Sequence, residues 1–304
     1  MTNRSRIVFQ ERVPKVVYQL QIQSANARNH ALTRAVLLNL GYEDQDLISS
    51  ETSGKQNFEL FDENAAKLEG VRKLFTRLAL SGVKVRLRRL APKDWLTLWK
   101  NQWTPAPLTK KLDVVPVWYR DRYKPRRGCD HILMDTLLSF GTGLHETTRF
   151  MAQFIEDQEG KFRSFLDIGT GTGILALVAL KNGAEEVLGI DIGSLSVQAA
   201  LDNMKANRSF FQVKKADIKS FRSKRTFDFV AANLVTEDLI GNAQKIISFV
   251  KEDGLLAVSG ISLENLGKLR KAFSLMPLKC LKVSRGKQWS GILYQKKAEF
   301  LIKH

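Results

Sequence analysis

The sequence predicts an α/β protein with a doubly wound, mostly parallel, seven-stranded sheet and a smaller N-terminal ferredoxin-like α+β domain. From about residue 128, strand-like apolar segments alternate with helical ones, which is typical of parallel βαβ units. Before residue 91 the predicted order is βαββαβ, which indicates a split sandwich. With 304 residues the chain has room for about two domains. We therefore expect an N-terminal domain over 1–90, a linker over 91–127 and the doubly wound domain over 128–304.

Period-two alternation and helix-stopping glycines define the N-terminal elements. Gly41 and Gly82 each follow a helical pattern, and Asp62 is the expected cap of the second helix. In chain order the elements are a strand at 16–22, a helix at 29–40, a weaker strand at 47–50, a strand at 57–61, a helix from 63 and a strand at 83–87. This fold by itself names no function.

The predicted linker has a composition of its own, with five of the seven prolines and four of the five tryptophans. Trp95, Trp99 and Trp103 are spaced by four, so a short helix opened by Pro92 would place them on one face. Such a stripe packs on a neighbouring domain or stacks on nucleic-acid bases, and the sequence leaves both interpretations open.

The doubly wound domain is predicted from seven strands and three helices between them. The strands lie at 165–168, 187–191, 211–213, 227–233, 255–259, 278–283 and 289–294, and the helices at 174–181, 194–204 and 239–250. Ser194 is the expected cap of the middle helix. Gly286 and Lys287 separate the last two strands, which therefore read as an antiparallel hairpin.

Composition excludes several classes of protein. Hydrophobic residues make up 44% of the chain and charged residues 26%, so it has enough apolar residues for a sizeable core. No apolar run reaches the ~18–20 residues of a membrane span, and the basic N-terminus has no apolar signal core. Two cysteines, Cys129 and Cys280, do not make a disulfide scaffold. We expect a cytoplasmic protein.

Positive charge is concentrated in two segments. Residues 72–127 carry a net charge of +13 and residues 261–304 carry +8, whereas residues 1–71 and 128–260 carry −1 and −3. This asymmetry is expected of a protein that meets an acidic partner such as RNA, although a solvated basic surface would look the same.

A glycine-rich turn at 169–173 marks the candidate site, because such a turn brings a cofactor close to the backbone at a helix N-terminus. A dinucleotide fingerprint starting at Gly169 needs glycine at position 174, which is Ile174, and the Gly-Lys-Ser/Thr of a phosphate loop is absent. With Asp191 ending the next strand, the pattern resembles the S-adenosylmethionine fold. Asp191 would accept hydrogen bonds from both ribose hydroxyls; otherwise it is a solvated strand-end residue.

Two further residues follow later strands of this sheet. Asp217 lies where such sheets usually contact the adenine amino group, and Asn233 ends the fourth strand at the same edge. Enzymes that methylate amino groups of bases usually carry Asn/Asp-Pro-Pro-aromatic at this point. The chain has Asn233-Leu234-Val235-Thr236 instead, which disfavours base N-methylation.

A nine-residue loop carries the most specific signal, Phe140-Gly141-Thr142-Gly143-Leu144-His145-Glu146-Thr147-Thr148. Joined to residues 167–173, Asp191 and residues 232–234, it resembles the ribosomal protein L11 methyltransferase family. Matching segments also occur at 94–99, 116–118, 259–261 and 288–289, so the resemblance covers about residues 90–296. Two segments depart from the family pattern, at 135–139 and 192–194, which puts part of the loop and of the adenosine pocket in doubt.

The resemblance implies the cofactor, the reaction and the partners. It implies S-adenosylmethionine contacts at Thr148, Gly169, Asp191 and Asn233, with Gly171 and Phe140 as neighbours. Asn233 would also position the substrate, a lysine or N-terminal amine of a large-subunit ribosomal protein recognised by the N-terminal domain. Ribosomal RNA is an expected contact of the basic segments, and membranes, DNA and metals are not expected. A non-catalytic ribosome- or RNA-binding factor and an RNA methyltransferase are the alternatives.

His145 has three interpretations. A metal site is disfavoured, because Cys129, Asp130 and His131 form no recognised zinc spacing with it. A second option is that His145 is a general base. The substrate amine hardly needs one, because burial lowers its pKa, as does a neighbouring sulfonium cation, so that it becomes neutral without a base. A hydrogen bond that orders the loop is the favoured role.

Overall fold

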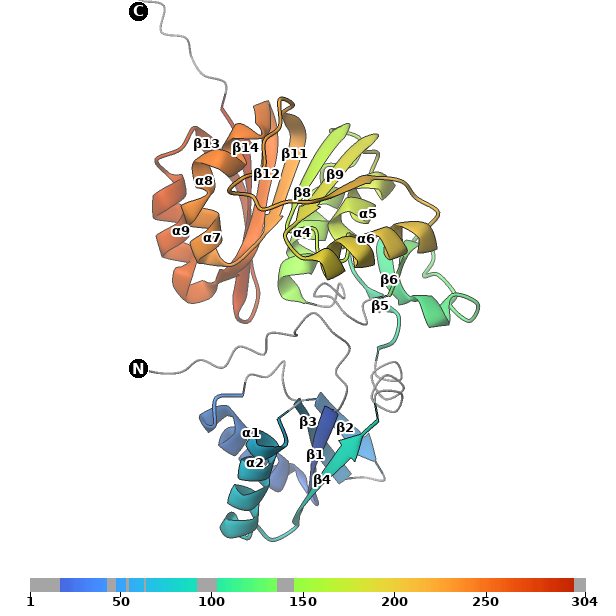
Figure 1. The fold of residues 1–304 in the computed structure, drawn as a ribbon, viewed down its shortest axis with the longest axis vertical. Coiled ribbons are helices and arrows are strands. Elements are labelled where there is room, and N and C mark those ends of the chain that lie inside the picture. The colour runs from blue at the N-terminus through green and yellow to red at the C-terminus, as the bar shows by residue number, and fades with distance from the viewer. Residues whose placement is uncertain are drawn as a thin grey trace, which may run out of the picture. The chain divides into compact units, whose positions relative to one another are not determined.

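The structure is a computed structural model that describes residues 17–42, 48–52, 55–62, 64–91, 103–135 and 145–297. The chain divides into two compact units, Met1–Gln102 and Trp103–His304 (Figure 1). This division differs from the linker expected at 91–127, because residues 103–127 fold within the second unit. None of the helices in the described ranges is long and apolar enough to cross a membrane.

The first unit is a four-stranded antiparallel sheet in the order β2-β3-β1-β4 with two helices. Its elements are β1 (Val17–Ser24), α1 (Ala27–Asn39), β2 (Ile48–Thr52), β3 (Lys55–Asp62), α2 (Ala65–Leu78) and β4 (Val83–Leu90), the βαββαβ order expected from the sequence. Leu20 and Ile22 of β1 are fully buried against Leu37 of α1 and Leu68 and Phe75 of α2. The alternation of β1 thus buries one face of the sheet beneath both helices.

The expected cap of α2 was wrong by two residues. Asn64 is the N-cap, and its side chain accepts a hydrogen bond from the Ala66 amide (3.0 Å). Asp62 instead accepts a hydrogen bond from the Asn64 amide (2.8 Å) and pairs with Lys67 (2.9 Å). Both residue types are good caps, so the choice depends on where the backbone leaves β3.

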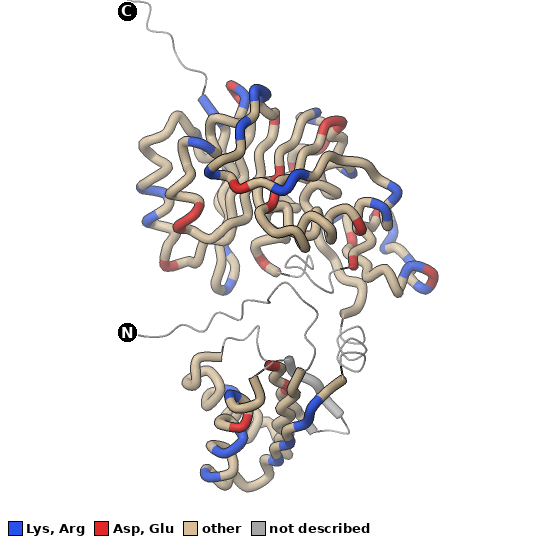
Figure 2. The backbone as a smooth tube through the Cα atoms, viewed as in Figure 1, with Lys and Arg blue, Asp and Glu red and all other residues tan. Residues whose placement is uncertain are grey.

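The other face of this sheet is polar. On β1 and β4 the paired residues Gln21–Arg86 and Gln19–Arg88 lie on it. Gln19 is fully buried, donates to Glu59 of β3 (2.9 Å) and accepts from Arg88. Because β4 is an edge strand, its exposed Lys and Arg side chains give the first unit a basic edge (Figure 2).

The second unit is built on a seven-stranded sheet in the order β10-β9-β8-β11-β12-β14-β13. Its elements are α4 (Glu146–Glu156), β8 (Ser164–Ile168), α5 (Ile174–Lys181), β9 (Glu186–Asp191), α6 (Ser194–Ala206), β10 (Gln212–Lys215), β11 (Phe227–Asn233), α7 (Thr236–Gly241), α8 (Ala243–Ser248), β12 (Val250–Ser262), α9 (Leu266–Phe273), β13 (Leu278–Arg285) and β14 (Trp289–Lys296). The first five strands in this order are parallel, and β14 and β13 form the predicted antiparallel hairpin. The sequence thus predicts the doubly wound sheet correctly.

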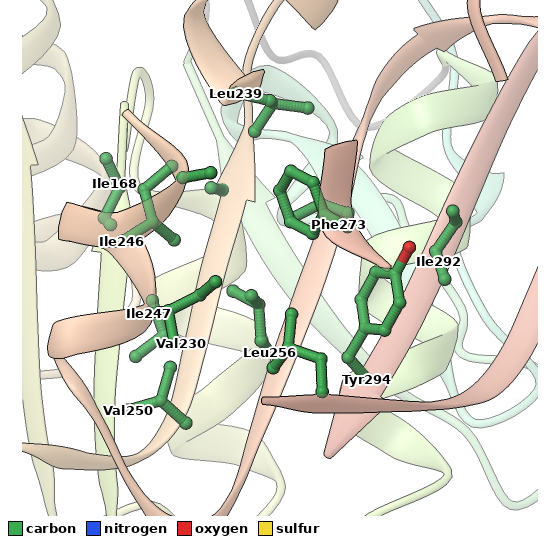
Figure 3. Packing of buried hydrophobic residues seen from close by; sticks show 14 of the residues in the cluster. Ile168, Val230, Leu239, Ile246, Ile247, Val250, Leu256, Phe273, Ile292 and Tyr294 are labelled. Atoms are coloured by element: carbon green, nitrogen blue, oxygen red, sulfur yellow. The ribbon is translucent and has the colours of Figure 1, made fainter. Parts of the chain in front are cut away.

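Chain order reverses between β8 and β11, which are neighbours in the sheet. A crevice at such a switch point, beyond the carboxyl ends of the strands, is where open α/β sheets bind ligands. On one face, α7, α8 and α9 bury Leu239, Ile246 and Phe273 against strand residues such as Val230 and Leu256 (Figure 3).

Two helix predictions were wrong. The single helix expected at 239–250 is two helices, α7 and α8, broken at Asn242, whose side chain donates to the Asp238 carbonyl (2.8 Å). Ser194 is the first residue of α6 rather than its cap, which is Gly193, and the Ser194 hydroxyl accepts a hydrogen bond from Lys215 (2.6 Å).

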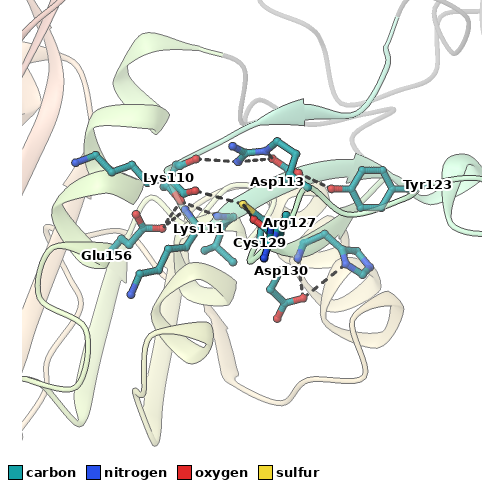
Figure 4. A network of polar contacts seen from close by, with 12 residues as sticks. Lys110, Lys111, Asp113, Tyr123, Arg127, Cys129, Asp130 and Glu156 are labelled. Carbon is teal, nitrogen blue, oxygen red and sulfur yellow. Dashed lines mark hydrogen bonds and ion pairs between the residues drawn. The ribbon is translucent and has the colours of Figure 1, made fainter.

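A small sheet, β5 (Ala106–Pro107), β6 (Leu112–Pro116) and β7 (Asp130–Met134), was not predicted. Buried Asp113 accepts hydrogen bonds from Arg126 (2.7 Å) and Tyr123 (Figure 4). Burial opposes ionisation of Asp113, but these hydrogen bonds outweigh it and lower its pKa. Arg126, one of the cations of the basic segment 72–127, thus stabilises the small sheet. Trp95 and Trp99 lie outside the described residues, and Trp103 is buried with its ring edge-on to Trp118 (5.3 Å).

Side-chain amides of Asn203 in α6 and of its C-cap, Asn207, anchor this small sheet. Asn207 both donates to and accepts from the backbone of Leu133 (2.7 and 2.8 Å), and Asn203 accepts from the Asp135 amide (2.6 Å). Asn203 is fully buried and also donates to the carbonyl of Thr172 in the glycine turn (3.0 Å). One asparagine thus connects the end of β7 to that turn.

Asp228 ties β11 to β8, and replacing it with asparagine should make stability less dependent on pH. Its carboxylate accepts hydrogen bonds from the Ser164 amide and hydroxyl (both 2.8 Å) and from Lys251 (2.6 Å). Burial alone would raise the pKa of Asp228, but these partners hold it well below the ordinary value. We expect Asp228→Asn to lower the free energy of unfolding by about 1–3 kcal/mol at pH 7.

The sign follows from linkage. Because the folded pKa is below the unfolded value of about 3.9, the contribution is complete above about pH 5 and is lost as pH falls further. Urea unfolding at pH 7 and pH 3 should therefore show a smaller difference between Asp228→Asn and the unchanged protein at pH 3. Asp202→Asn, at an exposed site on α6, is the control. A difference that stays constant or grows on acidification would contradict the assignment.

Candidate functional site

A cavity of about 370 Å³ lies at the carboxyl edge of the parallel strands, within the size range of small-molecule sites. Five of the six predicted site residues line it: Thr148, Gly169, Gly171, Asp191 and Asn233. The sixth, Phe140, lies outside the described residues. The other lining residues come from the same strand ends and from α5, α6, α7 and the loop after β10: Ile168, Thr170, Thr172, Ile174, Leu175, Ile190, Ile192, Ser196, Ala216, Asp217, Ile218, Lys219, Leu234, Asp238 and Asn242.

The glycine turn forms the floor of this cavity between β8 and α5. Gly169 has a φ of +74°, which residues with a side chain rarely adopt, and a Cβ there would lie 2.7 Å from the end of the Leu234 side chain, so glycine is favoured at this position. The backbone then enters α5, whose N-cap, Gly173, makes no side-chain cap hydrogen bond. Ile174 and Leu175 of its first turn line the cavity, so a ligand there would lie beside the N-terminus of α5.

Asp167 supports the turn from below. Its carboxylate accepts a hydrogen bond from the Thr170 hydroxyl (2.7 Å), while the side chain is almost completely buried. Burial raises the pKa of Asp167 to about 7. Asp167 does not line the cavity, so it acts on the shape of the turn.

Asp191 lies at the end of β9 with both carboxylate oxygens engaged. One oxygen accepts a hydrogen bond from the Gly171 amide (2.9 Å) and the other from the Gly193 amide (2.8 Å). These contacts fix the carboxylate, and each oxygen retains a lone pair for a ligand hydroxyl. The family departure at Gly193 leaves this hydrogen bond in place, because the backbone makes it.

Asp217 follows β10 and lines the same cavity, as its position in the sequence suggested. It accepts a hydrogen bond from the Lys219 amide (2.8 Å), and the neighbouring Ala216 amide donates to the Asp191 carbonyl (2.8 Å). With Asp191 and Asp238, it makes the lining acidic apart from Lys219.

Asn233 is connected to the start of α4 through Thr147, which the sequence reasoning did not single out. The Asn233 side-chain amide donates to the Thr147 hydroxyl (3.3 Å), and that hydroxyl lies 2.7 Å from Nδ1 of His145. His145 is the N-cap of α4, and burial lowers its pKa. Thr147 is part of the nine-residue loop motif, so the motif carried the signal although only Thr148 was chosen from its two threonines.

Two other features of the described residues bear on where a site can lie. Among the described residues, no group of three or more His, Cys, Asp and Glu side chains is arranged to hold a metal. A hollow of about 530 Å³ lies in the first unit, lined by Gln21, Glu69, Arg72, Val85, Arg86, Leu87 and Arg88. It contains no glycine turn or strand-end carboxylate, so we place the active site in the cavity at the switch point.

The doubly wound sheet, the glycine turn without a dinucleotide or phosphate-loop signature, and a strand-end aspartate over the cavity define an S-adenosylmethionine-dependent methyltransferase. The family model for ribosomal protein L11 methyltransferase (PrmA) matches residues 9–297, and the chain belongs to this family.

Named relatives agree with this assignment. A ribosomal protein L11 methyltransferase of Caldanaerobacter subterraneus is 32% identical over 72% of this chain and 70% of its own. One from Pelobacter propionicus is 30% identical over 84% and 85%. The crystal structure of ribosomal protein L11 methylase from Lactobacillus delbrueckii superposes with a TM-score of 0.59 at 29% identity, covering 64% of this chain and all of that one. The chain is thus an enzyme of ribosomal protein methylation that uses S-adenosylmethionine.

Proposed function

We propose that this enzyme transfers methyl groups from S-adenosylmethionine to lysine or N-terminal amines of ribosomal protein L11. The observation that carries the proposal is that the glycine turn, Asp191 and Asn233 all line one cavity. The relatives named for this substrate support its identity. On this proposal the first unit recognises the substrate, and the enzyme works in the cytoplasm, where ribosomal proteins are made.

The lining suits the cofactor in three respects. Asp191, held by two amides, would accept hydrogen bonds from the ribose hydroxyls, and Asp217 would accept one from the adenine amino group. Bare backbone at Gly169 and Gly171 leaves room for the rest of the molecule, with Thr148 at the cavity wall. Acidic side chains also favour a ligand that carries a sulfonium cation.

When bound, S-adenosylmethionine supplies an electrophilic methyl group on sulfur. The substrate amine must be neutral to accept it, and burial beside a cation lowers an amine pKa from about 10.4. Asn233 would orient the amine, since attack requires the amine nitrogen to lie about 3–3.5 Å from the methyl carbon and in line with the sulfur. The proton leaves to water, so the chain needs no general base.

Labelled cofactor tests the proposal directly. Incubation with the enzyme, purified ribosomal protein L11 and, separately, ribosomal RNA should label the protein on amino groups. Label on RNA alone would replace the proposal with an RNA methyltransferase. Calorimetry with S-adenosylmethionine is the second measurement, and absence of binding would favour a non-catalytic binding factor.

The basic edge of the first unit is a proposed contact with ribosomal RNA in assembling particles. Reversing the charges of Lys84, Arg86 and Arg89 together should weaken binding to RNA-containing particles. The slope of log affinity against log salt concentration should become shallower by about 0.7–0.9 for each phosphate contact that is lost. All three side chains are exposed, and Arg88 is left unchanged because it holds Gln19.

The same variant should methylate isolated ribosomal protein L11 at the unchanged maximal rate at saturating substrate, because none of the three residues lines the cavity. Filter binding across a salt series gives the slope, with reversal of Lys205 and Arg208 in the second unit as the control. Unchanged particle binding at moderate salt would show that this edge is only a solvated surface.

A further inference from the structure

We propose that His145 and Thr147 hold the Asn233 side chain in one orientation, with Nδ2 turned to Thr147 and Oδ1 presented to the substrate amine. The inference rests on the proposed function, because it assigns the atom that receives the amine. The three side chains lie in a row, with Asn233 Nδ2 at 3.3 Å from the Thr147 hydroxyl and that hydroxyl at 2.7 Å from His145 Nδ1.

The direction of each hydrogen bond follows from the helix cap. The Thr147 amide can only donate, and it donates to Nδ1 of His145 (3.3 Å), so Nδ1 carries no proton. The Thr147 hydroxyl must therefore donate its own proton to Nδ1, since two acceptors cannot share a hydrogen bond. Its oxygen is then an acceptor, which selects the NH₂ end of the Asn233 carboxamide and leaves Oδ1 for the cavity.

Packing around His145 keeps it in the required state. Its ring meets the edge of Trp289 at the start of β14 (5.4 Å between centroids), and burial lowers its pKa, so that the neutral ring is favoured. The adjacent Glu146 accepts hydrogen bonds from the backbone amides of Lys287 (2.9 Å) and Gln288 (3.3 Å). A Cβ at Gly286 would lie 2.5 Å from this carboxylate, so the turn between β13 and β14 is fitted closely to α4.

The orientation matters for the chemistry. A neutral amine has N–H bonds to donate and one lone pair that must attack the methyl carbon. An Oδ1 acceptor binds an N–H and leaves the lone pair directed elsewhere. A flipped amide would donate to that lone pair and block attack. His145 and Thr147 are therefore positioning residues, and the site favours nucleophiles that carry N–H donors.

Thr147→Val tests the inference, because it removes the hydroxyl and keeps the shape. We expect methyl transfer in single turnovers to slow about tenfold, as one hydrogen bond in the row is lost. Cofactor affinity by calorimetry should change less than about twofold, since Thr147 does not line the cavity. Thr147→Ser, which retains the hydroxyl, should rescue most of the rate that Thr147→Val loses.

A double-mutant cycle separates positioning from general damage. In an Asn233→Ala background, Thr147→Val should have no further effect, because the carboxamide it orients is absent. Equal slowing in both backgrounds, or a normal rate for Thr147→Val in the unchanged protein, would overturn the inference. Thermal unfolding of each variant identifies any loss of folding. If the unchanged enzyme neither binds S-adenosylmethionine nor methylates ribosomal protein L11, the proposed function fails instead.

Discussion

Replacing Asn233 with alanine should slow methyl transfer about 100-fold while the protein stays folded. The side chain ends β11 at the cavity and is held through Thr147, so its loss removes the group that places the amine. A displacement of about 1 Å at a reacting atom costs on the order of 10²-fold in rate, because the in-line geometry is lost. Single-turnover methylation of ribosomal protein L11 at saturating cofactor measures the step itself.

The affinity of the Asn233→Ala variant for S-adenosylmethionine should fall much less than its rate. Gln198→Ala, which removes an exposed carboxamide from α6, is the matched control and should behave as the unchanged enzyme. If the variant reacted at the normal rate once saturated with cofactor, Asn233 would be a cofactor contact alone.

Replacing Asp191 with alanine should have the opposite effect, a large loss of cofactor affinity and a small loss of rate at saturating cofactor. A charge-assisted hydrogen bond is typically worth about 1.5–3 kcal/mol, so the cofactor dissociation constant should rise roughly tenfold to a hundredfold. The variant also removes the acceptor of the Gly171 and Gly193 amides, which places its effect at the upper end of that range. Asp191→Asn retains one side-chain oxygen, so its dissociation constant for the cofactor should lie between those of Asp191→Ala and the unchanged enzyme.

Calorimetry with S-adenosylmethionine measures the affinity, and the rate at saturating cofactor should recover most of its value in Asp191→Ala. The two variants thus divide binding from positioning. Equal losses of affinity in Asp191→Ala and Asn233→Ala would contradict that division of roles.

The parts of the fold that follow from local pattern were predictable. Local sequence is enough to recognise apolar strands such as β8 and β11 and the glycine turn after β8, because each is a run of consecutive residues. The alternation of such strands with helices along the chain indicates a doubly wound sheet. The same holds for the hairpin of β13 and β14 with Gly286 at its turn. Asp191 and Asn233 could be placed because each ends a strand at the same edge.

Features decided by distant contacts were not predictable. The sheet of β5, β6 and β7 depends on side chains of α6, a connection between segments about seventy residues apart. The break at Asn242 depends on a side chain that bonds its own helix, which composition does not distinguish from an exposed asparagine. Thr147 and Thr148 are alike in sequence and differ in their contacts: Thr147 bonds to Asn233 and His145, whereas Thr148 lines the cavity. The predictions for Trp95, Trp99 and Phe140 stand as predictions.

The contact between α4 and the hairpin of β13 and β14 has a consequence for how the enzyme becomes active during its synthesis. The Glu146 side chain accepts a hydrogen bond from the amide of Lys287, 141 positions later, and the His145 ring contacts Trp289. The hairpin of β13 and β14 is therefore needed to complete the surroundings of the row that leads to Asn233. During translation, the glycine turn and Asp191 emerge long before β14. A partly made chain can therefore contain the residues of the cofactor pocket before the Asn233 side chain has been oriented to accept the substrate amine. Competence to methylate is therefore expected only once β14 has been made and packed against α4.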